Sequence, residues 1–151
     1  MSLRRRGDQC VRSGNVRSPE VTSIVMSQAL PSIVTQWLER ISNRDAIGAA
    51  DCFTEDAVYH YAIPHPPVTG RDGIRGMFSG QATMYKRISW EITESAVCGD
   101  RVWMERLDRF FTHDGREIAI ECAGVVELEG GLISEVRDYV DLHTWEERNK
   151  S

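Results

Sequence analysis

Residues 102–142, with the sequence VWMERLDRFFTHDGREIAIECAGVVELEGGLISEVRDYVDL, decide the fold of this chain. They continue a strand pattern that begins just upstream, where Ile88, Trp90 and Ile92 alternate with polar residues. The Asp114-Gly115 pair is a strong hairpin signal, and two adjacent glycines at 130–131 mark a second turn. The stretch therefore predicts an antiparallel meander of three strands, at 102–111, 117–128 and 132–142.

Helices are predicted ahead of this sheet. The first begins near Pro31, a residue suited to an opening helical turn, and ends at Asn43-Arg44. Its apolar residues fall at i, i+3, i+4 and i+7 and make one face: Val34, Trp37, Leu38 and Ile41. Asp45 can cap a second helix that reaches roughly Thr54. Three of its residues are expected to face inward: Ile47, Ala50 and Phe53.

The middle of the chain joins these helices to the sheet. A strand-like stretch at 57–61 ends in a loop that contains Pro64, Pro66 and Pro67. A third, short helix is predicted around residues 74–78. Helices first and a strand meander afterwards are typical of the α+β class. We therefore expect a curved antiparallel or mixed sheet that wraps into a cone, with the N-terminal helices closing a central pocket.

Charge is unevenly distributed along the 151 residues, which fit one domain. Residues 1–25 hold five arginines against Asp8 and Glu20, a local charge of +3, so the total of −5 leaves −8 for the rest. We expect a disordered basic tail at 1–25 and a folded domain at 26–151, with Met26 as an alternative translation start. Phosphate repulsion makes the acidic domain a poor nucleic-acid binder.

The cysteines and the hydropathy pattern bear on localisation. Cys52 and Cys122 lie in apolar contexts typical of small buried residues, and the four cysteines in the chain match no zinc spacing. A reducing compartment fits best, and we expect a cytoplasmic protein. No apolar run approaches the length of a membrane span, and no secretory signal pattern follows the early arginines.

Three charged residues are the candidates for chemistry. On the last strand, Asp138 shares the more apolar face with Val136 and Val140, and a buried carboxylate there needs a partner. Arg106 and Asp108, two residues apart, point the same way from the strand 102–111. The apolar pattern does not settle which face of that strand is inward. We choose the Arg106 face because it supplies a counter-charge for Asp138.

Convergence of these three residues would have a chemical consequence. A confined pair of like charges resists double ionisation, so one aspartate stays a base while the other carries a proton. Such a pair can take a proton from one atom and give one to another. A buried ion-pair network that only supports the sheet is the alternative interpretation.

The segments Glu105-Arg106-Leu107-Asp108 and Val136 to Leu142 resemble the limonene-1,2-epoxide hydrolase family. The run Phe53 to Tyr59, the proline loop and Gly70-Arg71-Asp72 resemble it as well, so the similarity covers roughly residues 31–148. The family has a cone fold shared with scytalone dehydratase, nuclear transport factor and SnoaL-like proteins. The resemblance implies a homodimer that uses no cofactor and no metal.

The resemblance also implies roles for particular residues. Asp138 matches the general base that deprotonates water, and Asp108 matches the acid that protonates the oxygen of a small hydrophobic epoxide. Arg106 matches the arginine that bridges the two carboxylates, and Tyr59 matches a tyrosine that holds the water. The implied product is a vicinal diol, formed without a covalent enzyme ester.

Two departures from the family pattern leave alternatives open. The water-holding asparagine is replaced by Tyr61, so His60 or Tyr61 is a candidate for holding the water. The tryptophan before Arg137 is replaced by Val136, which predicts a reshaped substrate pocket. A SnoaL-like or polyether-type cyclase or isomerase, acting on a polyketide or terpenoid, is one alternative. A non-catalytic binding module of the same fold is another. The histidines lack further ligands at metal spacing, so no metal site is expected.

Overall fold

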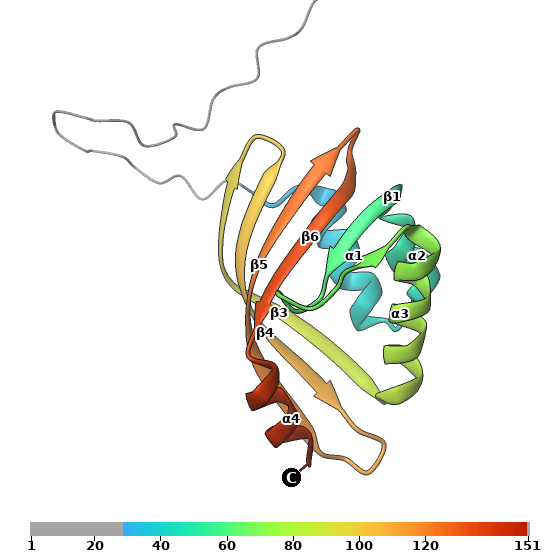
Figure 1. Cartoon of the computed structure of the whole chain (residues 1–151), viewed down its shortest axis with the longest axis vertical. Coiled ribbons are helices and arrows are strands. Elements are labelled where there is room, and N and C mark those ends of the chain that lie inside the picture. Colours follow the sequence, from blue (N-terminus) through green and yellow to red (C-terminus); the bar gives the residue numbers. More distant parts are fainter. Residues whose placement is uncertain (1–28, 151) are drawn as a thin grey trace, which may run out of the picture.

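A computed structural model describes residues 29–150 of the chain (Figure 1). The predicted tail at 1–25 and the alternative start at Met26 lie outside the described residues. The helices are α1 (Ser32–Ser42), α2 (Ala46–Asp51), α3 (Arg71–Met84) and α4 (Leu142–Lys150). The strands are β1 (Phe53–His60), β2 (Val68–Thr69), β3 (Arg87–Cys98), β4 (Arg101–Phe111), β5 (Glu117–Glu129) and β6 (Leu132–Val140).

The strands form one mixed sheet in the order β2-β1-β6-β5-β4-β3. The predicted meander is its major part, because β3, β4, β5 and β6 pair antiparallel with their neighbours in sequence. Among the described strands only β1 and β6 pair in parallel, which brings the first strand beside the last one. The sheet is strongly bent, and α1, α2 and α3 lie on its inner side (Figure 1). The predicted α+β cone architecture is therefore confirmed.

The inner face of the sheet holds the core. Along β4 every second side chain from Val102 to Phe110 is buried, as expected for a strand with one covered face. This pattern confirms the choice of the Arg106 face as the inward one. Trp37 of α1 is fully buried and makes edge-to-face contacts with Phe53, Tyr59 and Trp90, so α1 packs at the centre of the aromatic core.

Two of the predicted elements end earlier than expected. The second helix does not reach Thr54, because α2 ends at Asp51 and Phe53 begins β1. Phe53 is fully buried as a strand residue that pairs with Ile133 of β6. The last strand does not reach Leu142 either, because the carboxylate of Asp141 accepts hydrogen bonds from the backbone N–H groups of His143 and Thr144. These bonds cap α4, a helix that the strand assignment missed.

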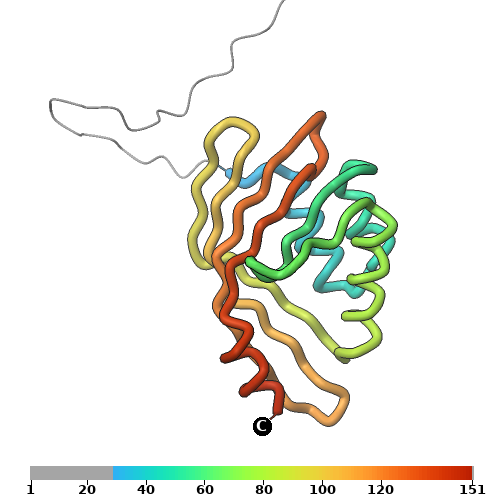
Figure 2. Tube along the Cα trace, in the orientation of Figure 1, coloured from blue at the N-terminus to red at the C-terminus, as the bar shows by residue number. Residues whose placement is uncertain are grey.

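The C-terminal helix lies away from the other three. Figure 2 shows α4 continuing from β6 to the end of the sheet where the β4–β5 hairpin turns. Arg148 donates to the carbonyl oxygen of Ala119 and pairs with Glu121 at 3.1 Å, which ties α4 to β5. Among the described helices, none combines the length and the hydropathy needed to cross a bilayer.

Candidate functional site

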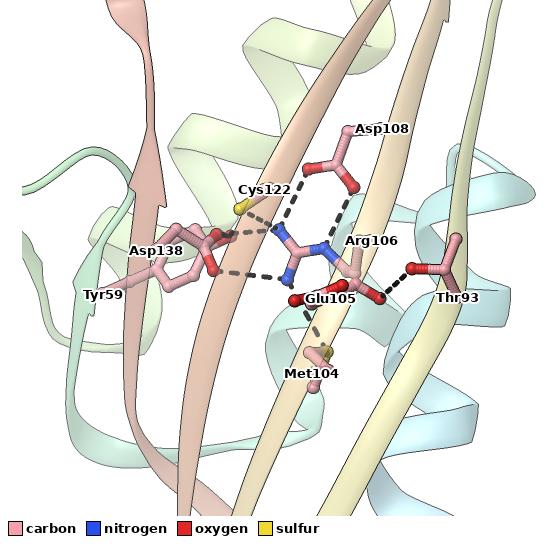
Figure 3. Close-up of polar contacts among 8 residues, drawn as sticks. All are labelled: Tyr59, Thr93, Met104, Glu105, Arg106, Asp108, Cys122 and Asp138. Atoms are coloured by element: carbon pink, nitrogen blue, oxygen red, sulfur yellow. Dashed lines mark hydrogen bonds and ion pairs between the residues drawn. The ribbon is translucent and has the colours of Figure 1, made fainter.

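The guanidinium group of Arg106 lies between the carboxylates of Asp108 and Asp138 (Figure 3). Its Nε and Nη2 donate to Oδ1 and Oδ2 of Asp108, both at 2.9 Å. Its Nη1 and Nη2 donate to Oδ1 and Oδ2 of Asp138, at 3.2 and 3.0 Å. Both pairs are bidentate, which fixes the plane of each carboxylate relative to the guanidinium. The three predicted residues therefore meet.

Burial strengthens the electrostatic interactions between Arg106 and the two carboxyl groups. Arg106 is 2% exposed, Asp108 5% and Asp138 3%. Burial alone would lower the pKa of Arg106, but the carboxylates of Asp138 and Asp108 raise it well above its usual range, so the cation is permanent. The guanidinium also lies 4.8 Å from the ring centroid of Trp90, which adds a cation–π contact.

Tyr59 distinguishes the two carboxylates. Its hydroxyl donates to Oδ2 of Asp138 at 2.8 Å, and burial together with the charge of Asp138 raises the pKa of this hydroxyl well above its usual value. Asp138 therefore accepts three side-chain hydrogen bonds, whereas the two bonds that Asp108 accepts both come from Arg106. The difference between the two carboxyl groups is the hydrogen bond that Asp138 receives from the Tyr59 hydroxyl.

Asp108 has the opposite tendency. Burial raises its pKa, and the charge of Asp138 raises it further, while the opposing effect of Arg106 does not cancel the rise. A carboxyl group with a raised pKa is the one that holds a proton. The raised pKa makes Asp108 easier to protonate than an exposed aspartate. Two carboxyl groups that share one guanidinium can take a proton from one atom while giving one to another.

Both aspartates face a cavity of about 330 Å³ that lies between the sheet, α3 and α4. Arg106 does not line it and stands behind the carboxylates. The remaining lining is mostly apolar or aromatic: Tyr59, Tyr61, Met77, Gln81, Met84, Tyr85, Trp90, Phe110, Ile120, Cys122, Val140, Leu142 and Trp145. Such a cavity suits a small hydrophobic ligand that is oriented by a few polar groups.

Of the other predicted site residues, one lines the cavity and two do not. Tyr61 lines the cavity and is 41% exposed, which places it at the opening. His60 does not reach the cavity; strand alternation turns it away from Tyr59, and it lies 3.5 Å from Glu135. Val136 is also no part of the cavity wall, because it is fully buried in the core and pairs with Tyr59 and Val126 on the neighbouring strands.

Several lining residues were not predicted. Trp145 closes one side, with its ring centroid 4.8 Å from that of Phe110. The signal for it was present, since Leu142 and Trp145 are spaced i, i+3 after the capping residue Asp141. Cys122 is held at 3.3 Å from Nη2 of Arg106, and burial raises its pKa, so it stays a thiol. Within residues 29–150, no three His, Cys, Asp or Glu side chains gather as metal ligands would.

Solved structures of low sequence identity share this fold. A protein of Catenulispora acidiphila with a ketosteroid isomerase-like fold has 23% identity and a TM-score of 0.72, covering 81% of this chain and 95% of that one. An LEH-like epoxide hydrolase of M. tuberculosis has 21% identity and a TM-score of 0.65, covering 78% and 86%. The epoxide hydrolase/cyclase-like enzyme SalBIII, which has a role in pyran ring formation in the polyether salinomycin, has 18% identity and a TM-score of 0.68. That match covers 75% of this chain and 91% of SalBIII.

The family model for the SnoaL-like domain matches residues 34–136. That span runs from the buried face of α1 through the meander to the middle of β6, and it includes Tyr59, Arg106 and Asp108. The chain therefore belongs to the SnoaL-like domain family.

Proposed function

We propose that this protein is an epoxide hydrolase that adds water to a small hydrophobic epoxide in one step. The observation that carries the proposal is the buried guanidinium of Arg106 between two carboxyl groups that both face one largely apolar cavity. Ring opening of an epoxide needs a base for the attacking water and an acid for the leaving oxygen. The site offers one of each within reach of the same ligand.

In the proposed reaction Asp138 is the general base. It takes a proton from a water molecule while the water oxygen forms a bond to one epoxide carbon. The Tyr59 hydroxyl donates its hydrogen to Asp138 at 2.8 Å, which leaves the phenol oxygen to accept a hydrogen bond from the same water. Two contacts would then orient the nucleophile, one to the carboxylate and one to the phenol.

Asp108 is the general acid. As the carbon–oxygen bond of the epoxide breaks, the oxygen takes the proton that Asp108 carries, and the product is a vicinal diol. Asp138 is left protonated and Asp108 ionised, and proton exchange with solvent restores the starting state. Arg106 holds both carboxyl groups in place and offsets the negative charge that passes from one to the other.

Diol formation from limonene oxide and cyclohexene oxide tests this proposal. We expect the wild-type protein to give the diol above the uncatalysed background. Asp138→Asn and Asp108→Asn should each lower kcat by about 10²–10⁴-fold, the range typical of general acid–base groups. Asp56→Asn, at an exposed position on β1, is the matched control and should retain full activity. Diol formation that persists in both site variants would refute the assigned roles.

A cyclase is the second candidate, and one observation favours it. The limonene-1,2-epoxide hydrolases that this chain resembles hold their water with an asparagine two residues after the tyrosine. This chain has Tyr61 there, a partly exposed residue at the opening of the cavity. A hydroxyl group of the substrate itself could then take the place of water beside Asp138. A cyclase would convert a hydroxy-epoxide into a cyclic ether without incorporating oxygen from labelled solvent, whereas a hydrolase would give a labelled product.

A further inference from the structure

Gln81, in the last turns of α3, brings an unsatisfied polar group to the cavity. It lines the cavity, and its Oε1 is buried without a hydrogen-bond partner among the described residues. Leaving a buried amide oxygen unpaired is costly, and most such atoms in proteins have a partner. A half-turn of the amide exchanges its oxygen and nitrogen, so Gln81 can serve either a donor or an acceptor.

Tyr85 lies one helical turn further on and adds a second polar group. Its backbone N–H donates to the carbonyl oxygen of Gln81 at 3.0 Å, and its side chain is 4% exposed and lines the cavity. Its ring packs against the rings of Phe110 and Trp145, and its hydroxyl makes no hydrogen bond to the part of the chain that the structure describes. Burial raises the pKa of this hydroxyl, which keeps it a neutral donor and acceptor.

Gln81 and Tyr85 lie apart from the two aspartates. The ring of Tyr85 lies 4.9 Å from that of Phe110, and Phe110 is the next inward-facing residue after Asp108 on β4. Two residues along a strand span roughly 6.6 Å. The cavity therefore has a charged end at Asp108 and Asp138 and a neutral polar end at Gln81 and Tyr85. Aromatic side chains, among them Phe110, line the cavity between the two ends.

From this arrangement we infer that the substrate carries a second oxygen function, a hydroxyl or a carbonyl, on the part of its skeleton remote from the epoxide. The inference rests on the proposed function for the epoxide as the reacting group. For the remote oxygen function it rests on the positions of Gln81 and Tyr85. A ligand oxygen at the neutral end would satisfy side-chain groups that are otherwise unpaired. A pure hydrocarbon would leave them unpaired and lose that gain.

A matched pair of substrates tests the inference: the epoxides of 4-ethylcyclohexene and of 4-(hydroxymethyl)cyclohexene, which differ only in CH₃ against OH. We expect kcat/KM for the hydroxymethyl epoxide to be higher by about tenfold or more, as one or two buried hydrogen bonds allow. Gln81→Leu and Tyr85→Phe should each shrink that ratio toward one. Met77→Leu, a volume-conserving change in the same wall, should leave the ratio unchanged.

Affinity for the two corresponding diols separates this inference from the proposed hydrolysis, because binding needs no turnover. If neither epoxide reacts but the wild-type protein binds the hydroxymethyl diol several-fold more tightly, and Gln81→Leu abolishes the difference, hydrolysis fails and the neutral polar end stands. Equal or reversed selectivity in the wild-type protein would overturn the inference. So would a ratio that stays the same in both Gln81→Leu and Tyr85→Phe.

Discussion

Gly124 of β5 lies directly opposite Asp138 of β6, and a Cβ atom added at Gly124 would lie 2.7 Å from Oδ1 of Asp138. The same atom would lie 3.3 Å from Nη1 of Arg106. The absence of a side chain at Gly124 therefore makes room for the carboxylate and guanidinium to meet above the sheet. This relationship positions the proposed general base through a residue that does not line the cavity.

Gly124→Ala should displace the Asp138 carboxylate, which cannot simply swing away because Arg106 and Tyr59 hold it. We expect kcat to fall by about 10²-fold, as small misplacements of catalytic groups do, and the free energy of unfolding to fall by about 1–3 kcal/mol from overpacking. Steady-state kinetics and urea unfolding measure the two effects.

Gly80→Ala is the control for this substitution, because nothing lies within 4 Å of a Cβ there and the site is in a helix. It should leave kcat unchanged and stabilise the protein by roughly 0.5–1 kcal/mol. Wild-type activity in Gly124→Ala would show that the position of Asp138 does not depend on the open space.

Tyr59→Phe removes the hydroxyl that donates to Asp138 and keeps the buried ring, which packs against Trp37 and Phe78. We expect kcat to fall by about 10–100-fold and stability by about 1–3 kcal/mol, because a buried carboxylate oxygen loses a donor. Tyr139→Phe is the matched control, since Tyr139 is the neighbour of Asp138 on β6 but is 49% exposed on the other face. Equal activities of the two variants would remove Tyr59 from the mechanism.

The pKa of Asp108, raised above its ordinary value of 3.8, predicts two pH effects. The acid is lost as pH rises through the raised pKa, so kcat/KM should decline on the basic side of its profile. The folded state also binds this proton more tightly than the unfolded chain does. The stability that the bound proton contributes is therefore present at low pH and is lost as pH rises from 3.8 through the raised pKa. A kcat/KM that rises with pH throughout the measurable range would contradict the assignment of Asp108 as the acid.

Arg106→Leu should be among the most destabilising single changes in the chain. It leaves two buried carboxyl groups without their cation, and breaking a buried ion pair in this way costs about 3–5 kcal/mol. The cost should be much smaller when Asp108 and Asp138 are both already asparagine, so a double-mutant cycle of unfolding free energies measures the coupling.

Arg109→Leu, one strand position past Asp108 but on the outer face, is the control for the loss of an arginine, and it should change stability little. A cost for Arg106→Leu that does not depend on the two aspartates would mean that the guanidinium acts through packing instead.

Much of the fold and the charged site could be predicted from local signals. Asp114-Gly115 placed the β4–β5 hairpin correctly, and the strand period put Asp138 inward. The inward face of β4 was ambiguous from apolar residues alone, because Trp103 and Phe111 lie on the other face. The electrostatic argument decided it: a buried Asp138 needs a cation, and Arg106 was the residue that could supply one.

The remaining features depend on contacts between distant parts of the chain. Phe53 belongs to β1 because β6 offers Ile133 as a parallel partner 80 positions later, and the register of this pair shifts before Val58. The neutral polar end of the cavity exists only because α3 ends where Tyr85 meets Phe110. No local period marks either meeting, so neither could be predicted from spacing.

A single-turnover reaction in water labelled with oxygen-18, with the protein in excess over limonene oxide, tests the direct addition of water most sharply. The account predicts one solvent oxygen in every diol molecule of the first turnover and no label in the peptides that contain Asp108 and Asp138. An unlabelled first-turnover diol, with the label found instead in the carboxyl group of either aspartate, would contradict it by revealing a covalent ester.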